Sequence, residues 1–356
     1  MINAKINSIL EMMVCLQCGG TIVFHRINST NGIFVCPACF AVYCLQQGVA
    51  TILPKSYLDK NKYISFSAEN RSFWQSNPKL KSHFDIFTHS LSNKISKWED
   101  DDVAFWDAKY IGGCLELQTK KLVGRAYQRN QVLFQPIREM GISNHRILEV
   151  GCGEAISAQK LLLPYGNNFI YIATDYSFQA LKHLTKRLQK RTNVLYIQCL
   201  GDAIPFNDNT FDDIICLGVL HHMPKKEGHV PYLISKLKPE GLLLINEPYD
   251  RDYRLPRLLE NIFQKIIEPQ QSAHEERINM IKFQTNLKKG GSVIKEKHGH
   301  TPVKTVLIRI TGSLYERSVG FVKFVLLIDK IVEVTIGKVW GLFSSGDCLI
   351  LFKRTK

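Results

Sequence analysis

Four cysteines near the N-terminus have the types and the spacing of a metal site. The segment CLQCGGTIVFHRINSTNGIFVCPAC places Cys15, Cys18, Cys36 and Cys39 in two C-x-x-C pairs separated by seventeen residues. Each pair bends the chain so that its two thiolates point the same way, and two such knuckles complete a tetrahedral S4 shell suited to zinc. Four protein ligands leave no position for water, so the spacing predicts a structural zinc ion. The alternative is four unligated thiols in a core.

The residues around these cysteines are those of a small zinc-dependent unit. Gly19 and Gly20 permit the tight backbone after the first pair, and Asn31-Gly32 predicts a hairpin turn. A unit of about fifty residues buries too little apolar surface to fold alone, and a structural zinc ion adds roughly 10–16 kcal/mol. Cys44 falls outside the spacing, so we expect it to be a buried thiol.

A second group of residues could hold a nucleotide. In HRILEVGCGEA a short apolar strand precedes Gly151 and Gly153, and glycines at such a turn allow the backbone to approach a ligand closely. The next apolar segment, FIYIATDYS, ends in Asp175, which is placed to accept hydrogen bonds from both ribose hydroxyls of an adenosine group. In GDAIPF, Asp202 follows a glycine at a strand end and could bind the adenine amino group.

A parallel sheet is needed to bring these side chains together. From about residue 124, short apolar runs alternate with amphipathic segments, which is typical of βαβ units. The expected strands are ILEV, FIYIATDYS, residues 194–199, DDIICLGVL and GLLLINEPY, and Ser177 is expected to cap the helix after the second strand. Every candidate binding residue would then lie at the carboxyl end of a strand, where open α/β sheets bind their ligands.

These motifs together resemble those of the class I S-adenosylmethionine-dependent methyltransferases. ILEVGCGEA is similar to the glycine-rich first motif, ATDYS to the acidic second motif, GDAIPF to the adenine-binding turn, LGVLHHMP to the fourth-strand motif and LKPEGLLLINEP to the fifth. The resemblance covers roughly residues 124–250. It implies an α/β fold with a Rossmann-like seven-stranded sheet, in which GDCLILFKRTK is the last, antiparallel strand. Ala155 departs from the pattern, because many members carry a third glycine there.

The resemblance implies S-adenosylmethionine as the cofactor and places eight residues of these motifs beside it. They are Glu149, Gly151, Gly153, Asp175, Tyr176, Asp202, Ala203 and Leu217. Within this set the two glycines would face the methionine part, which Glu149 would steady, and Asp175 would hold the ribose. Asp202 and the backbone of Ala203 would hold the adenine.

The fourth-strand motif bears on the methyl acceptor. Enzymes that methylate exocyclic amines of bases or of glutamine typically carry [N/D]-P-P-[Y/F] there, whereas this chain has LGVL. VLHHMP resembles the small-molecule methyltransferases related to those of quinone biosynthesis. In plant-type O-methyltransferases a histidine in a similar position is the general base, so His221, beside His222, is a candidate base for a hydroxyl or an amine. The alternative is that both histidines only pack and hydrogen-bond at the strand end.

The four-cysteine segment, residues 1–56, is predicted to be a zinc ribbon and is compatible with more than one function. It resembles the small zinc-ribbon activator of tRNA and rRNA methyltransferases and the ribbon of the large-subunit rRNA guanine-N1 methyltransferases, but similar ribbons also precede small-molecule methyltransferases. Our leading hypothesis is methyl transfer to an oxygen or nitrogen of a small molecule, such as a specialised metabolite or a glycan precursor. The alternative is an rRNA or tRNA base methyltransferase whose ribbon recognises RNA. A non-catalytic adaptor that binds proteins through the ribbon is the third hypothesis.

The basic charge of the chain is concentrated near its C-terminus. The formal net charge is +14, and residues 251–356 hold 19 Lys and Arg against 10 Asp and Glu. The excess therefore indicates the substrate side of the protein more than a nucleic-acid partner. Residues 319–343 have one wholly apolar helical face, which could pack on its own domain, cover an apolar substrate or lie on a membrane surface.

The 356 residues are expected to form four parts. These are a zinc ribbon (1–56), a helical linker or N-terminal cap (57–123), the cofactor-binding core (124–250), and a substrate cap with closing strands (251–356). Glu11 interrupts the first apolar stretch, which argues against a secretory signal. We expect the reducing cytoplasm as the compartment, where paired cysteines indicate metal before disulfide. The sequence does not indicate an oligomeric state.

Overall fold

The structure is a computed structural model that describes the main elements of the chain. It describes residues 8–92, 141–223, 226–249, 278–299 and 346–355, with isolated positions within 134–139 and 324–331. Most of the linker after residue 92 and most of the predicted cap lie outside the described residues, and so does nearly all of the amphipathic stretch 319–343.

Four short antiparallel strands carry the N-terminal cysteines. They are β1 (Val23–Arg26), β2 (Gly32–Val35), β3 (Val42–Gln46) and β4 (Val49–Thr51). The hairpin expected at Asn31-Gly32 is present, but its turn spans residues 27–31, and Gly32 already pairs with Arg26. A Cβ at Gly32 would collide with the ring of Phe24. The glycine therefore serves the close packing of the strand, and its role in the turn was wrongly predicted.

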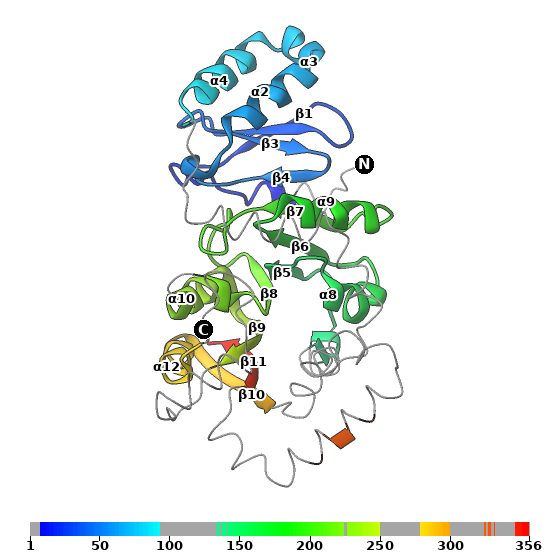
Figure 1. The fold of residues 1–356 in the computed structure, drawn as a ribbon, viewed down its shortest axis with the longest axis vertical. Coiled ribbons are helices and arrows are strands. Elements are labelled where there is room, and N and C mark those ends of the chain that lie inside the picture. Colours follow the sequence, from blue (N-terminus) through cyan, green and yellow to red (C-terminus); the bar gives the residue numbers. More distant parts are fainter. Residues whose placement is uncertain are drawn as a thin grey trace, which may run out of the picture.

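Three helices follow the ribbon and pack over it. They are α2 (Lys60–Glu69), α3 (Arg71–Ser76) and α4 (Pro78–His89), and Figure 1 shows them beyond the ribbon, at the end of the molecule farthest from the C-terminal strands. Buried aromatic rings form their common core, with Trp74 and Phe84 at 4.8 Å between ring centroids. The Tyr63 hydroxyl donates to the Val42 carbonyl at 2.8 Å, which joins α2 to β3.

Seven further strands form the core sheet. Five are parallel: β5 (Arg146–Val150), β6 (Ile170–Asp175), β7 (Val194–Gln198), β8 (Phe211–Leu217) and β9 (Leu237–Tyr249). They lie in the order β7-β6-β5-β8-β9, and β11 (Gly346–Arg354) then pairs antiparallel with both β9 and β10 (Gly291–Gly299). This order confirms the Rossmann-like seven-stranded sheet and the antiparallel strand expected at the C-terminus.

Helices cover both faces of this sheet. In Figure 1, α8 (Ile156–Leu161) and α9 (Phe178–Arg187) lie on one side, and α10 (Lys226–Lys236) and α12 (Met280–Gly290) lie on the other. Ser177 caps α9 as predicted, because its Oγ accepts from the Ala180 amide at 3.1 Å. None of the helices in the described ranges is long and apolar enough to cross a membrane.

The ribbon extends the core sheet. Strand β4 pairs in parallel with β7, with Val49 opposite Tyr196 and Thr51 opposite Gln198. All described strands therefore belong to one eleven-stranded sheet, in the order β1-β2-β3-β4-β7-β6-β5-β8-β9-β11-β10 (Figure 1). The domain boundary at residue 56 stays a prediction, but the ribbon shares backbone hydrogen bonds with the part of the sheet that carries the cofactor motifs.

Candidate active site

The four cysteines of the ribbon come together as predicted. Their Sγ atoms all lie within 4.8 Å of one another, and the Cys15–Cys39 and Cys18–Cys36 pairs are each 3.5 Å apart. Tetrahedral zinc with Zn–S bonds of about 2.3 Å requires sulfur–sulfur separations of about 3.8 Å. The donor set and its spacing therefore fit a structural zinc ion.

The two knuckles repeat one backbone geometry. The Gly19 amide donates to the Cys15 carbonyl at 2.8 Å, and the Phe40 amide donates to the Cys36 carbonyl at 2.9 Å. Gly19 and Phe40 both adopt positive φ, +74° and +61°, at equivalent positions of the two knuckles. Cys44 is buried outside the cluster, as expected, and burial raises the pKa of its thiol.

The loop after β5 has the backbone that its glycines predict. Gly151 and Gly153 adopt φ of +61° and +51°, and a Cβ at Gly151 would collide with Val219 in the loop after β8. Ala155, where many family members carry glycine, also lies in the left-handed region at φ +49°. The alanine thus keeps a glycine-like backbone, which costs a non-glycine residue free energy.

Asp175 connects the acidic motif with the glycine loop. Its Oδ2 accepts from the Gly153 amide at 2.7 Å, and its Oδ1 accepts from the Ser177 amide at 2.8 Å. A carboxylate oxygen accepts more than one hydrogen bond, so a carboxylate held here suits ribose hydroxyls beside the glycine loop. Tyr176 follows at the strand end and is half-buried.

Glu149 lies in the interior of the sheet. It is buried, and its carboxylate accepts a hydrogen bond from the Tyr171 hydroxyl. Burial raises the pKa of Glu149 to about 7, against the opposite effect of the Tyr171 hydrogen bond, and the negative charge of Asp175 raises it further. Glu149 therefore holds a proton far more readily than an exposed glutamate would.

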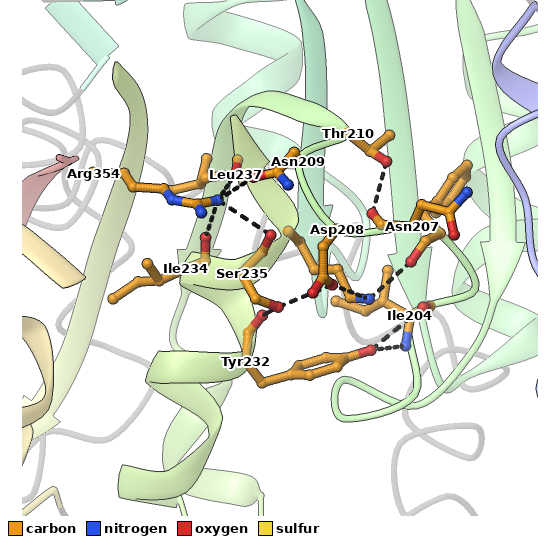
Figure 2. A network of polar contacts seen from close by, with 12 residues as sticks. Ile204, Asn207, Asp208, Asn209, Thr210, Tyr232, Ile234, Ser235, Leu237 and Arg354 are labelled. Atoms are coloured by element: carbon orange, nitrogen blue, oxygen red, sulfur yellow. Dashed lines mark hydrogen bonds and ion pairs between the residues drawn. The ribbon is translucent and has the colours of Figure 1, made fainter. Parts of the chain in front are cut away.

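The predicted adenine turn lies after β7 and is anchored to α10. Asp202 is exposed, and the Ala203 amide donates to the Leu200 carbonyl at 3.1 Å, which closes the turn. Figure 2 shows how the following residues are held: the Ile204 amide donates to the Tyr232 hydroxyl at 2.7 Å.

The C-terminal strand completes this network. In Figure 2 the Arg354 guanidinium of β11 donates to Asn209 Oδ1 at 2.7 Å and to the Ile234 and Ser235 carbonyls at the end of α10. Ser235 Oγ in turn donates to Asp208 at 3.1 Å. The arrangement ties the loop that follows the adenine turn to α10 and to the closing strand.

The loop after β8 carries the two histidines, and a residue of β9 holds it. Glu247 is buried, and its Oε1 accepts from the amides of Val219 and Leu220 at 2.8 and 2.9 Å. Its Oε2 lies 2.7 Å from His221 Nδ1. Because a carboxylate accepts from Nδ1–H, this contact favours, of the two neutral tautomers, the one with its proton on Nδ1 and its lone pair on Nε2. A histidine oriented in this way is built like a general base.

The other residues of this motif lie close by. The ring centroids of His221 and His222 are 3.9 Å apart. Leu217, the last residue of β8, is half-buried, and Gly218 follows it with φ +70° and donates its amide to the Asn246 carbonyl at 2.7 Å. The structure thus gathers the predicted residues of the core at the carboxyl ends of neighbouring parallel strands.

Glu247 is the site residue that the sequence motifs alone missed. It stands in the apolar run LLLINEP, one residue beyond the asparagine that pairs with the end of β8. A carboxylate near the end of a buried strand, with a histidine pair expected on the neighbouring strand, was the available signal.

Comparisons with known proteins found sequence similarity to methyltransferases. Residues 148–245 match the family model described as a methyltransferase domain. The ubiquinone/menaquinone biosynthesis C-methyltransferase of Pasteurella multocida is 25% identical over 179 residues, which are 49% of this chain and 65% of that protein. The ubiquinone biosynthesis O-methyltransferase of Rickettsia prowazekii is 30% identical over 106 residues, which are 30% of this chain and 40% of that protein.

One solved structure that is similar to this chain is that of phosphoethanolamine N-methyltransferase 2 from Haemonchus contortus, in complex with S-adenosyl-L-methionine. It is 16% identical, with a TM-score of 0.47, and the match covers 73% of this chain and 59% of that one. The chain spans less than two thirds of the length of the two ubiquinone-biosynthesis relatives named above.

Proposed function

We propose that this chain, whose residues 148–245 match a methyltransferase domain, transfers a methyl group from S-adenosylmethionine to an oxygen or nitrogen of a small molecule. The observation that carries the proposal is the meeting of three groups at one edge of the sheet. They are the glycine loop after β5, the Asp175 carboxylate hydrogen-bonded to it, and the His221–Glu247 pair on the next two strands.

The residues of the first three loops have separate roles in binding. Gly151 and Gly153 allow the backbone to approach the methionine part of the cofactor closely, because neither residue has a side chain. Asp175 binds the ribose hydroxyls, and exposed Asp202 binds the adenine amino group beside the turn closed by Ala203. S-adenosylmethionine, when bound, supplies a methyl group that its positive sulfonium already activates.

His221 acts on the acceptor in this proposal. The methyl carbon would pass from the sulfonium sulfur to the acceptor oxygen or nitrogen, leaving S-adenosylhomocysteine, and Nε2 of His221 would take the acceptor's proton. The Glu247 carboxylate, 2.7 Å from Nδ1, holds the ring in place and stabilises the positive charge that the ring then carries. General base catalysis typically accelerates a reaction by 10²–10⁴-fold. The rest of the rate acceleration would come from holding the acceptor in line with the methyl group.

The acceptor class is proposed from two features. The fourth-strand motif is LGVL, and it lacks the prolines typical of enzymes that methylate base or glutamine amines. The names of two similar proteins place them in ubiquinone or menaquinone biosynthesis, one as a C- and one as an O-methyltransferase. Both features favour a small molecule over RNA or protein as the methyl acceptor.

Labelled methyl donor and cell extract test the acceptor class. The purified protein is incubated with extract and methyl-labelled S-adenosylmethionine, and RNA is then separated from small molecules. We expect label in the small-molecule fraction, none without the protein, and less at low donor concentration when Asp175→Asn replaces the wild type. Label confined to RNA would establish the base-methyltransferase alternative. Absence of both label transfer and S-adenosylmethionine binding would leave the adaptor hypothesis.

A further inference from the structure

The ribbon contacts the core at the loops proposed to hold adenosine. On one side, the residues just before Cys15 lie against the segment that follows the adenine turn. The Val14 amide donates to the Pro205 carbonyl at 3.0 Å, and Met13 forms a β-bridge with Phe206. The side chains of Met13 and Phe206 are fully buried. The first metal knuckle is therefore joined directly to this segment.

On the other side, the last ribbon strand reaches the loop after β6. Thr51 Oγ1 in β4 donates to Gln198 Oε1 at 2.9 Å, and Gln198 Nε2 donates to the Tyr176 carbonyl at 2.9 Å. Tyr57 follows β4, and its ring meets the Tyr176 ring edge-on with centroids 6.4 Å apart. Tyr176 directly follows Asp175, so this chain of contacts ends at the proposed ribose-binding carboxylate.

Helix α10 holds the same segment from the opposite side. Lys236 Nζ donates to the Phe206 carbonyl at 2.8 Å, and Figure 2 shows the Tyr232 hydroxyl at Ile204. The segment 204–206 thus lies between a core helix and the ribbon. A displacement of the ribbon would remove one of its two supports.

We infer that the ribbon is a positioning element for the adenosine half of the cofactor site, so that zinc in the four-cysteine site raises the affinity for S-adenosylmethionine. The inference rests on the proposed function. Zinc would fix the knuckle of Cys15 against that of Cys36. It would thereby hold in place both sets of ribbon contacts, those with residues 205–206 and those that reach Tyr176 through Gln198. Without the metal, binding must order these loops, and that ordering subtracts from the binding free energy.

The coupling has a reciprocal consequence. If zinc increases the affinity for S-adenosylmethionine by some factor, bound S-adenosylmethionine must increase the affinity for zinc by the same factor. The second quantity is measurable without turnover, by competition of the zinc-loaded protein with a chelator. Coupling between two sites typically amounts to about 5–150-fold.

The test compares both affinities in the intact chain. Titration of S-adenosylmethionine into the zinc-loaded protein should give a Kd at least about fivefold lower than titration into stripped protein. S-adenosylhomocysteine should shift the zinc–chelator equilibrium by a similar factor. Equal zinc affinity with and without S-adenosylhomocysteine overturns the inference. Failure of the zinc-loaded wild type to bind S-adenosylmethionine overturns the proposed function, and the inference with it.

A matched pair of variants keeps the metal in place. Thr51→Val removes the hydroxyl that holds Gln198, whereas Thr30→Val makes the same change at the exposed turn between β1 and β2. With zinc bound, Thr51→Val should raise the Kd for S-adenosylmethionine about fivefold, the equivalent of ~1 kcal/mol for one hydrogen bond. Thr30→Val should leave it unchanged. A merely structural role for Thr51 would lower the melting temperature without this change in Kd, and that result also overturns the inference.

Discussion

The two halves of the candidate site are held in different ways. The adenosine half, residues 175–176 and 199–207, is supported by many contacts spread over the ribbon, β7 and α10. In the proposed methyl-transfer half, residues 218–222, one buried carboxylate makes several of the contacts, because Glu247 accepts from three backbone amides of the loop and contacts His221 Nδ1. Single substitutions should therefore have modest effects in the first half and large effects in the second.

The largest expected effect is at the His221–Glu247 pair. His221→Ala should lower kcat by about 10²–10⁴-fold, the usual contribution of a general base, with little change in the Kd for S-adenosylmethionine. Glu247→Gln should lower kcat by a comparable factor, because its amide group cannot accept all of the bonds that now reach the carboxylate. Steady-state kinetics and binding titrations measure the two quantities separately.

The double variant distinguishes positioning from an independent role. If Glu247 acts through His221, Glu247→Gln should cost little additional activity in the His221→Ala background. Full turnover by His221→Ala with intact cofactor binding would contradict the base role. It would leave both histidines as packing residues at the strand end.

The next effect concerns stability, at Glu149 beneath the glycine loop. The pKa of Glu149 is raised from 4.5 to about 7 in the folded protein, chiefly by burial. The folded state therefore holds the proton more tightly. The contribution of this bound proton to the unfolding free energy is complete below about pH 4.5 and is lost as the pH rises through 7. Relative to Glu149→Gln, the wild type should lose about 3 kcal/mol of unfolding free energy between pH 4.5 and pH 8.

Urea unfolding of both proteins across this pH range measures the difference. A constant difference between wild type and Glu149→Gln would show that the carboxyl titrates normally in the folded state, contrary to its burial beside Tyr171.

A smaller effect is expected in the adenosine half. Asp175→Asn removes one carboxylate oxygen that accepts from the Gly153 or Ser177 amide and, in our proposal, from the ribose. Hydrogen bonds to charged groups contribute about 1.5–3 kcal/mol, so the Kd for S-adenosylmethionine should rise about 10–100-fold. Ser177→Ala is the control: it should lower stability by removing the cap of α9, but leave the Kd nearly unchanged.

The smallest effect is at the departure from the family pattern. Ala155 adopts φ +49°, and Ala155→Gly should therefore raise the unfolding free energy by up to about 1 kcal/mol. Ala158→Gly, the same change inside α8, should lower it by at least about 0.5–1 kcal/mol because glycine is a poor helix former. Thermal melts that place both variants on the same side of the wild type would contradict the strain at Ala155.

The sequence was most informative where the chemistry is local. The four cysteines lie within 25 residues, and their spacing alone dictates how they meet. The five parallel core strands also lie where the motifs placed them along the chain, because each motif stands at the end of an apolar run. Glycines 151 and 153 adopt the positive φ that their type suggests, and the terminal strand pairs where the resemblance implied.

Contacts between distant segments were beyond reach. Gly32 was assigned to a turn because Asn-Gly is a strong local signal, but the ring of Phe24 across the hairpin decides its role. Glu247 lies 26 residues from His221, and only the pairing of β8 with β9 brings them together. The parallel pairing of β4 with β7, which makes the ribbon part of the sheet, has no signature in either segment.

The central claim is that the candidate site binds S-adenosylmethionine. Titration of this cofactor into the zinc-loaded protein tests it most directly, since the proposed roles of both halves require it. We expect saturable binding of one equivalent. Affinity should fall about 10–100-fold in Asp175→Asn and stay nearly unchanged in His221→Ala, because the two residues serve different halves. Absence of binding to the wild type, or equal affinity in Asp175→Asn, would contradict it.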